Sequence, residues 1–260
     1  MEISKQIIDK IKVLDELPNS QRFHQDTGAN SKISRKMLDG NVVALKKIQP
    51  EYKNTVEKRA QIFLREVTDH ILAQYPSVLP VCGFNLFHYS KSTKSFIYKP
   101  CLATVFCDGG MLSNVLKKMS KNKKLTKRFI QTQQYIFAYG IAKGMKKLYM
   151  NHILHRDLKN DNIFISKPKC QSENIPEDII PLFKNNSQYS IPFIADLGLA
   201  KVAQNSEQSQ QCGTFYYLAP EVMSSTKYSF PADVYSYSVI LSNIFQLKDK
   251  PDFDCKKTSL

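Results

Sequence analysis

The stretch HILHRDLKNDNIFI, residues 152–165, sets polar chemistry inside an apolar frame. Its middle holds basic residues, aspartates and asparagines, and apolar residues flank them on both sides. Polar side chains placed so tightly between apolar ones need hydrogen-bond partners once their neighbours are buried. The stretch is therefore either a solvated turn after a helix or a loop that holds a ligand, and the other motifs of the chain decide between the two.

The size and composition of the chain indicate a folded protein that favours anionic partners. Its 260 residues suffice for one large domain or two small lobes, and 42% of them are hydrophobic. Lysine and arginine outnumber the acids by 37 to 23, which gives a net charge of +14. This balance favours phosphates, nucleic acid, membrane surfaces or acidic proteins as partners.

The cysteines and the apolar runs bear on the cellular compartment. The six cysteines form no CxxC pair, which argues against a zinc site or a redox motif. Scattered cysteines without a signal peptide indicate a reducing compartment. The apolar runs are far shorter than the ~20 residues that span a bilayer, so we predict no transmembrane segment. We therefore expect a cytoplasmic protein, with the nucleus as the alternative.

The first two parts of the chain differ in pattern. Residues 1–21 begin with Ile3, Ile7, Ile11 and Leu14 at helical spacing, which predicts an amphipathic helix that ends before Pro18. This helix packs on the neighbouring domain or docks a partner. Residues 22–106 are rich in predicted strands, at 40–48, near 79–87 and at 95–106, with one helix at 54–75. The apolar stripe of this helix includes Ile62 and Val67, and we expect Arg65 and Asp69, which flank Glu66, to be exposed.

The third part, residues 107–260, is helical. Helices are predicted at 111–119, 128–152 and 232–247, after the pair Gly109-Gly110. The polar, proline-containing segment 166–190 indicates a surface insertion. The fold class is therefore α+β, with a strand-rich small lobe followed by a helical large lobe.

Two short motifs carry the chemistry. The loop 155–162 fits the pattern H-R-D-x-x-x-x-N at His155, Arg156, Asp157 and Asn162. An aspartate there can orient an attacking hydroxyl and accept its proton, and an asparagine five residues later can reach a metal ion from the same loop. The segment ADLGLA, residues 195–200, adds a hard carboxylate that suits Mg²⁺.

Together with VVALKK (42–47) and APE (219–221), these motifs resemble eukaryotic-type protein kinases over residues 22–245. The resemblance implies a bilobal kinase fold that uses ATP and Mg²⁺ and phosphorylates protein substrates. It also implies the catalytic set Asp157, Lys159, Lys46 and Glu66, and the metal ligands Asn162 and Asp196. Leu197 stands where the family has the phenylalanine of its D-F-G motif.

The resemblance also implies a nucleotide-binding set: Gly28, Ile33, Ala44, Lys46, Thr104, Val105 and Cys107. Strand alternation places Ala44 and Lys46 on one face and Lys47 on the other, in solvent. The glycine-rich loop aligns with DTGANSKI, residues 26–33, where only Gly28 is kept. Because the missing glycines would let the backbone approach phosphates closely, we expect weaker nucleotide binding.

Substrate class and regulation follow from the same comparison. Lys159, together with Thr214 bonded to the catalytic aspartate and lysine, is typical of Ser/Thr kinases, and the helix near 235–241 resembles the tyrosine-kinase-like branch. Asp233 is expected to cap the backbone of the catalytic loop. Ser206 and Ser209 are candidate phosphosites, with an unmodified polar loop as the alternative.

The leading interpretation is an ATP-dependent Ser/Thr protein kinase, and the alternative is a pseudokinase or nucleotide-binding scaffold. The lysine-rich run 117–128 could bind acidic partners, RNA or anionic lipid, or could be a solvated loop. It lacks interleaved aromatics, which argues against specific nucleic-acid binding.

The carboxyl end differs from the family pattern. Only residues 222–260 follow Glu221, so we expect a C-terminally truncated lobe in which Glu221 lacks its usual arginine. We also expect the apolar side chains of helix 232–247 to be uncovered. Exposure of several such side chains predicts a chain that is marginally stable or that associates.

Overall fold

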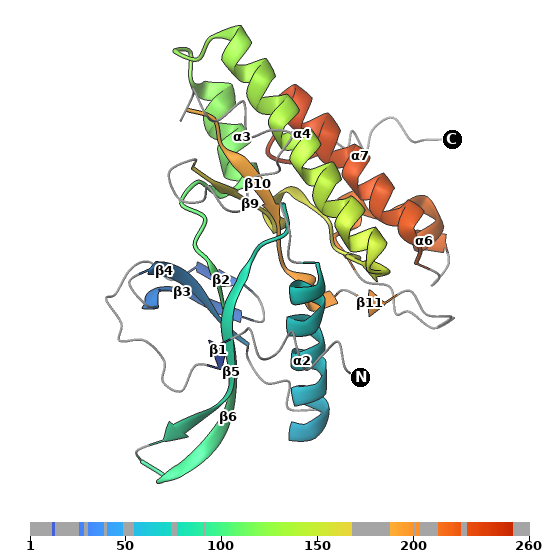
Figure 1. Ribbon diagram of the computed structural model, residues 1–260. Helices are drawn as coiled ribbons and strands as arrows, with labels where there is room; N and C mark the ends of the chain where they lie inside the picture. The colour runs from blue at the N-terminus through green and yellow to red at the C-terminus, as the bar shows by residue number, and fades with distance from the viewer. Residues whose placement is uncertain are drawn as a thin grey trace. The chain divides into compact units, whose positions relative to one another are not determined.

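The computed structural model describes residues 12–13, 26–28, 31–38, 41–48, 55–73, 77–90, 92–167, 188–199, 201–202, 213–224 and 228–251. The chain divides into two compact units. The first unit comprises residues 1–74 and 79–106, and the second comprises residues 75–78 and 107–260. Figure 1 shows strands β1 to β6 and helix α2 in the first unit, and helices α3, α4 and α7 with the short strands β9 and β10 in the second.

A six-stranded sheet forms the first unit, in the order β1-β5-β6-β4-β3-β2. Its strands are β1 (Lys12–Val13), β2 (Asp26–Gly28), β3 (Ser31–Leu38), β4 (Asn41–Ile48), β5 (Val81–Ser90) and β6 (Ser95–Val105). Neighbouring strands are antiparallel except β1 and β5, which run parallel with Lys12 opposite Gly83. The helix expected over the first 18 residues is therefore wrong at Lys12–Val13, which pair as a strand, and its other positions lie outside the described residues.

Helix α2 (Val56–Leu72) packs on this sheet. Thr55 caps it by accepting a hydrogen bond from the Lys58 N–H at 3.3 Å. Phe63 and Val67 of α2 are buried in one cluster with apolar side chains of β5 and β6. The sequence pattern placed Ile62 in the apolar stripe, but Ile62 is half exposed and its neighbour Phe63 is the buried residue.

The second unit contains α3 (Leu112–Lys121), α4 (Lys127–Met150), α6 (Pro220–Ser224) and α7 (Phe230–Gln246). Its strands are short: β7 (Gly110–Met111), β8 (Ile153–Leu154), β9 (Ile163–Ser166), β10 (Ile191–Ile194) and β11 (Lys201–Val202). The described part of this unit also contains the 3-10 turns η1 (Asn160–Asn162), η3 (Leu197–Leu199) and η4 (Phe215–Tyr217). Strand β10 lies just before Asp196 in the sequence and pairs with β9. Most of the segment 166–190 lies outside the described residues.

Helix α4 is the central element of this unit. It packs tightly on β10, since a Cβ at Gly144 would lie 2.8 Å from the Ile194 side chain. On another side it lies beside α7, as Figure 1 shows, and the Gln134 amide donates to the Ile244 carbonyl at 2.8 Å. This packing fixes the carboxyl end of α4, from which the chain turns into β8 and the catalytic loop.

Helix α7 is buried in part. Ile240 and Ile244 are fully buried, so the expectation of an uncovered apolar face is wrong for them. It is right for Val234 and Phe245, which are about half exposed. No described helix combines the length and the apolarity that crossing a membrane requires.

Candidate active site

The catalytic loop begins at His155 and is held by a carboxylate on α7. Asp233 is buried and accepts the His155 N–H at 2.8 Å and the Arg156 N–H at 3.0 Å. The Tyr228 hydroxyl also donates to Asp233 at 2.9 Å. Arg156 has a φ of 68°, a left-handed conformation that is unfavourable for a side chain of this size. The predicted capping role of Asp233 is confirmed, and this clamp holds the strained turn in place.

His155 joins the catalytic loop to the segment before Asp196. Its Nδ1 accepts the Asp157 N–H at 3.3 Å, so the ring proton resides on Nε2. Nε2 lies 3.0 Å from the Ala195 carbonyl oxygen and donates to it. The imidazole is fully buried and thus holds the two loops at a fixed separation.

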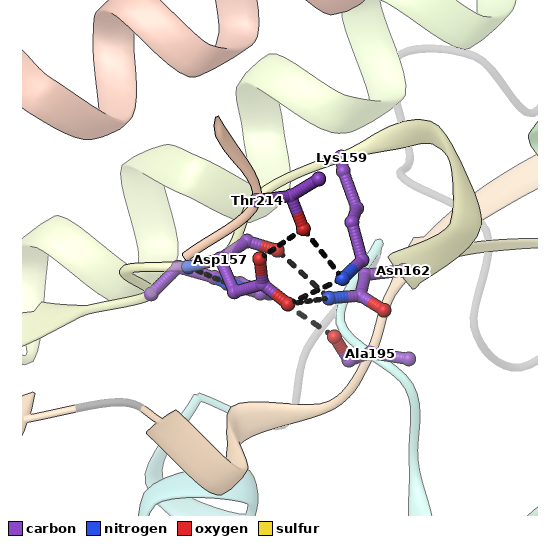
Figure 2. A network of polar contacts seen from close by, with 6 residues as sticks. Asp157, Lys159, Asn162, Ala195 and Thr214 are labelled. Atoms are coloured by element: carbon purple, nitrogen blue, oxygen red, sulfur yellow. Dashed lines mark hydrogen bonds and ion pairs between the residues drawn. The ribbon is translucent and has the colours of Figure 1, made fainter. Parts of the chain in front are cut away.

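Asp157 stands at the centre of a polar network (Figure 2). Its Oδ2 accepts from the Lys159 Nζ at 2.6 Å and from the Asn162 amide at 3.1 Å. Its Oδ1 accepts from the Thr214 hydroxyl at 2.8 Å, and that hydroxyl in turn accepts from Lys159 at 2.8 Å. The predicted contacts of Thr214 with the aspartate and the lysine are confirmed.

Among the described residues, Asp157 and Lys159 each keep one hydrogen-bonding position that this network does not use. A carboxylate has about four acceptor sites, and the described partners of Asp157 occupy three. The remaining site is on Oδ1, where a hydroxyl could donate. An ammonium has three protons, and Lys159 gives two of them to described partners. The third can reach an anionic group beside Asp157.

Asn162 and Asp196 lie at the same end of the β9–β10 ladder. Ile163 and Ile194 pair directly, and the Ala195 N–H donates to the Asn162 carbonyl at 2.9 Å. The Asn162 amide nitrogen donates to the Asp157 carbonyl at 2.7 Å, and Figure 2 shows its amide oxygen on the side away from Asp157. An amide oxygen and an exposed carboxylate from adjacent segments are the hard ligands that Mg²⁺ prefers, so the residues present fit this metal.

The backbone at Asp196 and the side chain after it differ in environment. Asp196 has a φ of 63° and is exposed, whereas Leu197 is fully buried. Burial of Leu197 fixes the turn in which the Asp196 carboxylate faces outward. Leucine thus supplies the apolar side chain expected in the position of the family's phenylalanine.

In the first unit, an ion pair joins β4 to α2. Lys46 Nζ lies 3.1 Å from the Glu66 carboxylate, which is buried. This contact confirms the pairing expected of these two residues. Lys47, the next residue, is exposed as the strand alternation predicted.

The candidate nucleotide-contacting residues of the sheet share one face with Lys46. Ile33 of β3 pairs with Lys46, and Ala44 pairs with Thr104 of β6. Because Ala44 and Lys46 are two residues apart, these four side chains form two adjacent rows on one face. The register therefore brings together residues that lie up to 71 positions apart in the sequence.

The other candidates are placed as follows. Gly28 lies in β2 opposite Ser31, so the DTGANSKI segment contributes to a hairpin at the edge of the sheet. The Val105 N–H donates to the Pro80 carbonyl at 3.1 Å, so its carbonyl, not its N–H, would have to serve a base. In the second unit, Cys107 is buried and its carbonyl accepts the Gly110 N–H at 3.2 Å.

Asp69 corrects one expectation. The sequence analysis implied that the residues flanking Glu66 are exposed, and Arg65 is, but Asp69 is buried. The pKa of Asp69 is raised to about 6, mainly by burial; the Arg65 charge opposes this increase, and the Glu66 charge adds to it. The helix therefore holds two acidic side chains on its buried side, of which the sequence pattern identified only Glu66.

A second polar cluster behind the catalytic loop was not predicted. Asn160 is fully buried and donates to the Asp249 carbonyl at 3.0 Å. Tyr217 is buried, which raises its pKa to about 12, and its hydroxyl interacts with the Asn160 backbone. Asn243 of α7 donates to that hydroxyl at 3.4 Å. A polar residue within the apolar α7 was the available signal, since a buried amide requires a partner.

Residues 27–257 match the protein kinase domain family. A probable serine/threonine-protein kinase of Dictyostelium discoideum is 26% identical over 214 residues, 82% of this chain and 14% of that protein. The RGS domain-containing serine/threonine-protein kinase A of the same organism is 28% identical over 226 residues, 87% of this chain and 17% of that protein. The mitogen-activated protein kinase kinase kinase dlk-1 of Caenorhabditis elegans is 29% identical over 217 residues, 83% of this chain and 18% of that protein. The chain thus spans less than a fifth of the length of these relatives.

The candidate phosphosites Ser206 and Ser209 lie outside the described residues.

Proposed function

Because the chain belongs to the protein kinase family, we propose that it transfers the γ-phosphate of ATP to serine and threonine hydroxyls of proteins. The observation that carries the proposal is the network around Asp157, which retains one acceptor site on Oδ1. A substrate hydroxyl that donates to this site would be oriented for attack, and Asp157 would accept its proton.

Lys159 and Thr214 support the choice of hydroxyl. Lys159 is held by Asp157 and Thr214, with its third proton directed to an incoming phosphoryl group. A fixed positive charge at that place stabilises the negative charge of the transferring group. Because Lys159 and Thr214 are hydrogen-bonded to each other and to Asp157, we infer that this arrangement accepts a serine or threonine hydroxyl.

Asn162 and Asp196 are the residues that would hold Mg²⁺, and Lys46, oriented by Glu66, would contact phosphate oxygens. The metal ion supplies neutralisation of the phosphate charge when it is bound. Asp196 is exposed and anchored between buried neighbours, so it can bind a cation without a large movement of its backbone.

The alternative, a pseudokinase or nucleotide-binding scaffold, rests on the β2–β3 hairpin. Gly28 is there, but Asp26 and Ser31 stand at the positions of the other glycines. An aspartate close to phosphates would repel them, and the side chains would restrict the approach of the backbone. Weak nucleotide binding without transfer is the behaviour that this observation favours.

Radiolabelled ATP, Mg²⁺ and a generic protein substrate distinguish the two functions. We expect transfer of label to the substrate and a rise of the melting temperature with Mg·ATP. A rise of the melting temperature without transfer would support the scaffold. The absence of both effects would contradict the two proposals together.

A further inference from the structure

The hairpin between α3 and α4 carries a dense group of basic residues on its surface. Seven cations fall within residues 117–128: Lys117, Lys118, Lys121, Lys123, Lys124, Lys127 and Arg128. All seven are exposed. Among the described residues only Lys117 of this group has an acidic partner, Asp249, at 3.6 Å. Among the described residues the other six cations have no acidic partner, so the hairpin presents a dense group of positive charges to solvent.

Helix stability does not account for all of these charges. Lys118 and Lys121 lie in the last turn of α3, where a cation is favourable. Lys127 and Arg128 occupy the first turn of α4, which has no acidic residue, and a cation there opposes the helix dipole. The helix is capped by Thr126 instead, which accepts the Phe129 N–H at 3.2 Å. Two cations thus stand where the local fold disfavours them, which indicates a role in binding.

The apolar side chains of the hairpin are engaged inside the unit. Leu116 and Met119 are buried, and Phe129 stacks on Tyr189 with ring centroids 5.2 Å apart. Among the described residues 117–128 there is no aromatic side chain on which a base could stack, and Leu125 is the one apolar side chain at the tip, partly buried between the lysines. Six of its seven cations are lysines, which attract anionic groups as hydrated point charges and need no fixed geometry of the partner. These features favour the carboxylates of a flexible acidic protein segment over RNA or lipid.

We propose that this cationic hairpin, residues 117–128, docks acidic segments of protein partners. The occupant is a flexible stretch rich in aspartate or glutamate, held by charge complementarity and not by a shaped pocket. Binding of this kind raises the association rate and falls steeply with ionic strength.

The position of the hairpin relative to Asp157 adds a constraint on substrates, which rests on the proposed function. The Ser113 hydroxyl donates to Asp161, four residues after Asp157 in the same loop. Lys121 lies eight residues further along α3, on the order of 12 Å along the helix axis. An extended peptide advances about 3.3 Å per residue, so a substrate has to carry its acidic block about four or more residues from the acceptor hydroxyl.

Binding is tested with a fluorescent peptide of eight consecutive glutamates and its glutamine counterpart, in the absence of nucleotide. The variant is Lys123→Gln/Lys124→Gln/Lys127→Gln/Arg128→Gln. The matched control, Lys58→Gln/Lys94→Gln/Lys99→Gln/Lys146→Gln, removes the same charge from exposed lysines elsewhere. We expect the hairpin variant to weaken glutamate-peptide binding about tenfold, with an unchanged or higher melting temperature, and the control variant to lose far less. Equal losses in both variants would overturn the proposal, since they would reflect net charge alone.

Two further probes separate the classes of partner: a uridine 20-mer and phosphatidylserine vesicles. Binding of either one more tightly than the glutamate peptide, with loss in the hairpin variant, would overturn the assignment to acidic protein segments. The spacing is then tested with peptides in which two or six residues separate the acceptor serine from the acidic block. The acidic block lies before the serine in one set of peptides and after it in the other. We expect a lower KM for the longer spacing in the wild type and no difference in the hairpin variant. If glutamate-peptide binding holds while no peptide is phosphorylated, the proposed kinase function fails and the docking surface stands.

Discussion

Asp157 occupies the one position in the network where removal of a charge should separate chemistry from binding. Its carboxylate accepts from Lys159, Asn162 and Thr214, and we infer that its remaining site takes the substrate hydroxyl. Asp157→Asn keeps the size of the side chain but cannot accept the proton. We expect phosphate transfer to fall by roughly 10²–10⁴-fold, in line with the loss of a general base. Nucleotide-induced thermal shifts should remain close to those of the wild type, and near wild-type turnover would refute the assignment.

Thr214 offers a test of the hydroxyl that bridges Asp157 and Lys159. Thr214→Ala removes the bridge, whereas Thr214→Ser retains the hydroxyl and serves as the matched control. We expect kcat to drop in the alanine variant by about 10- to 150-fold, because one hydrogen bond to a charged group is worth about 1.5–3 kcal/mol. The serine variant should recover most of the activity.

Mass spectrometry of the products should show phosphoserine and phosphothreonine, and predominant phosphotyrosine would contradict the proposed substrate class.

Asp69 links the burial of one residue to the pH dependence of folding. Its pKa of about 6 in the folded chain exceeds the ordinary value of 3.8. The folded state therefore binds the proton more tightly between these values, and the resulting stabilisation is present at low pH and lost as pH rises through 6. Asp69→Asn removes this titration. The difference in free energy of unfolding between the variant and the wild type should therefore shift in favour of the variant by about 1–3 kcal/mol between pH 4 and pH 7.5. Urea denaturation of both proteins at the two pH values measures this, and parallel pH dependences would contradict it.

At the scale of elements, α7 positions the catalytic loop through a single carboxylate. Asp233 accepts two backbone N–H groups of a turn in which Arg156 has a positive φ. Asp233→Asn replaces one acceptor oxygen with a donor and leaves a buried N–H unsatisfied. We expect a loss of about 1–3 kcal/mol of stability together with a lower kcat, because the loop loses its support.

Tyr228→Phe is the control for this clamp. It removes the hydroxyl bond to Asp233 and leaves both backbone contacts in place. The stability loss should be about 0.5–1.5 kcal/mol, with activity largely kept. A Tyr228→Phe variant as inactive as Asp233→Asn would show that the backbone contacts are not the decisive ones.

At the scale of the whole molecule, binding of Mg·ATP should stabilise the folded chain in proportion to its affinity. A ligand at 100 times its dissociation constant adds about 2.7 kcal/mol. Asp196→Asn, which replaces a carboxylate that we infer binds the metal, should reduce the thermal shift produced by Mg·ATP. The shift produced by ATP with EDTA should be the same in both proteins. An undiminished Mg·ATP shift in the variant would show that Asp196 does not bind the metal.

The sequence by itself determined the order of the motifs, the alternation of strand faces and the chemical type of each candidate residue. Spacing is a local property. The sequence alone could therefore assign Lys46 and Lys47 to opposite faces of one strand, and Asn162 to the same loop as Asp157. The same local reasoning predicted α2, α3, α4 and α7 within a few residues, because each has an apolar stripe or caps that the chain carries in its own residues.

Contacts between distant segments were decided by the tertiary structure. Three features depend on which surfaces pack against each other. They are the burial of Asp69, the Asn160–Tyr217–Asn243 cluster and the parallel pairing of β1 with β5. A helical periodicity does not specify whether an acidic residue at the edge of the stripe is covered, and two residues of the predicted N-terminal helix form a strand because a sheet edge offers them partners. The chemical types of the site residues could thus be predicted from the sequence. Their protonation and their partners depend on the fold, because desolvation and hydrogen bonding act between residues that are close only in space.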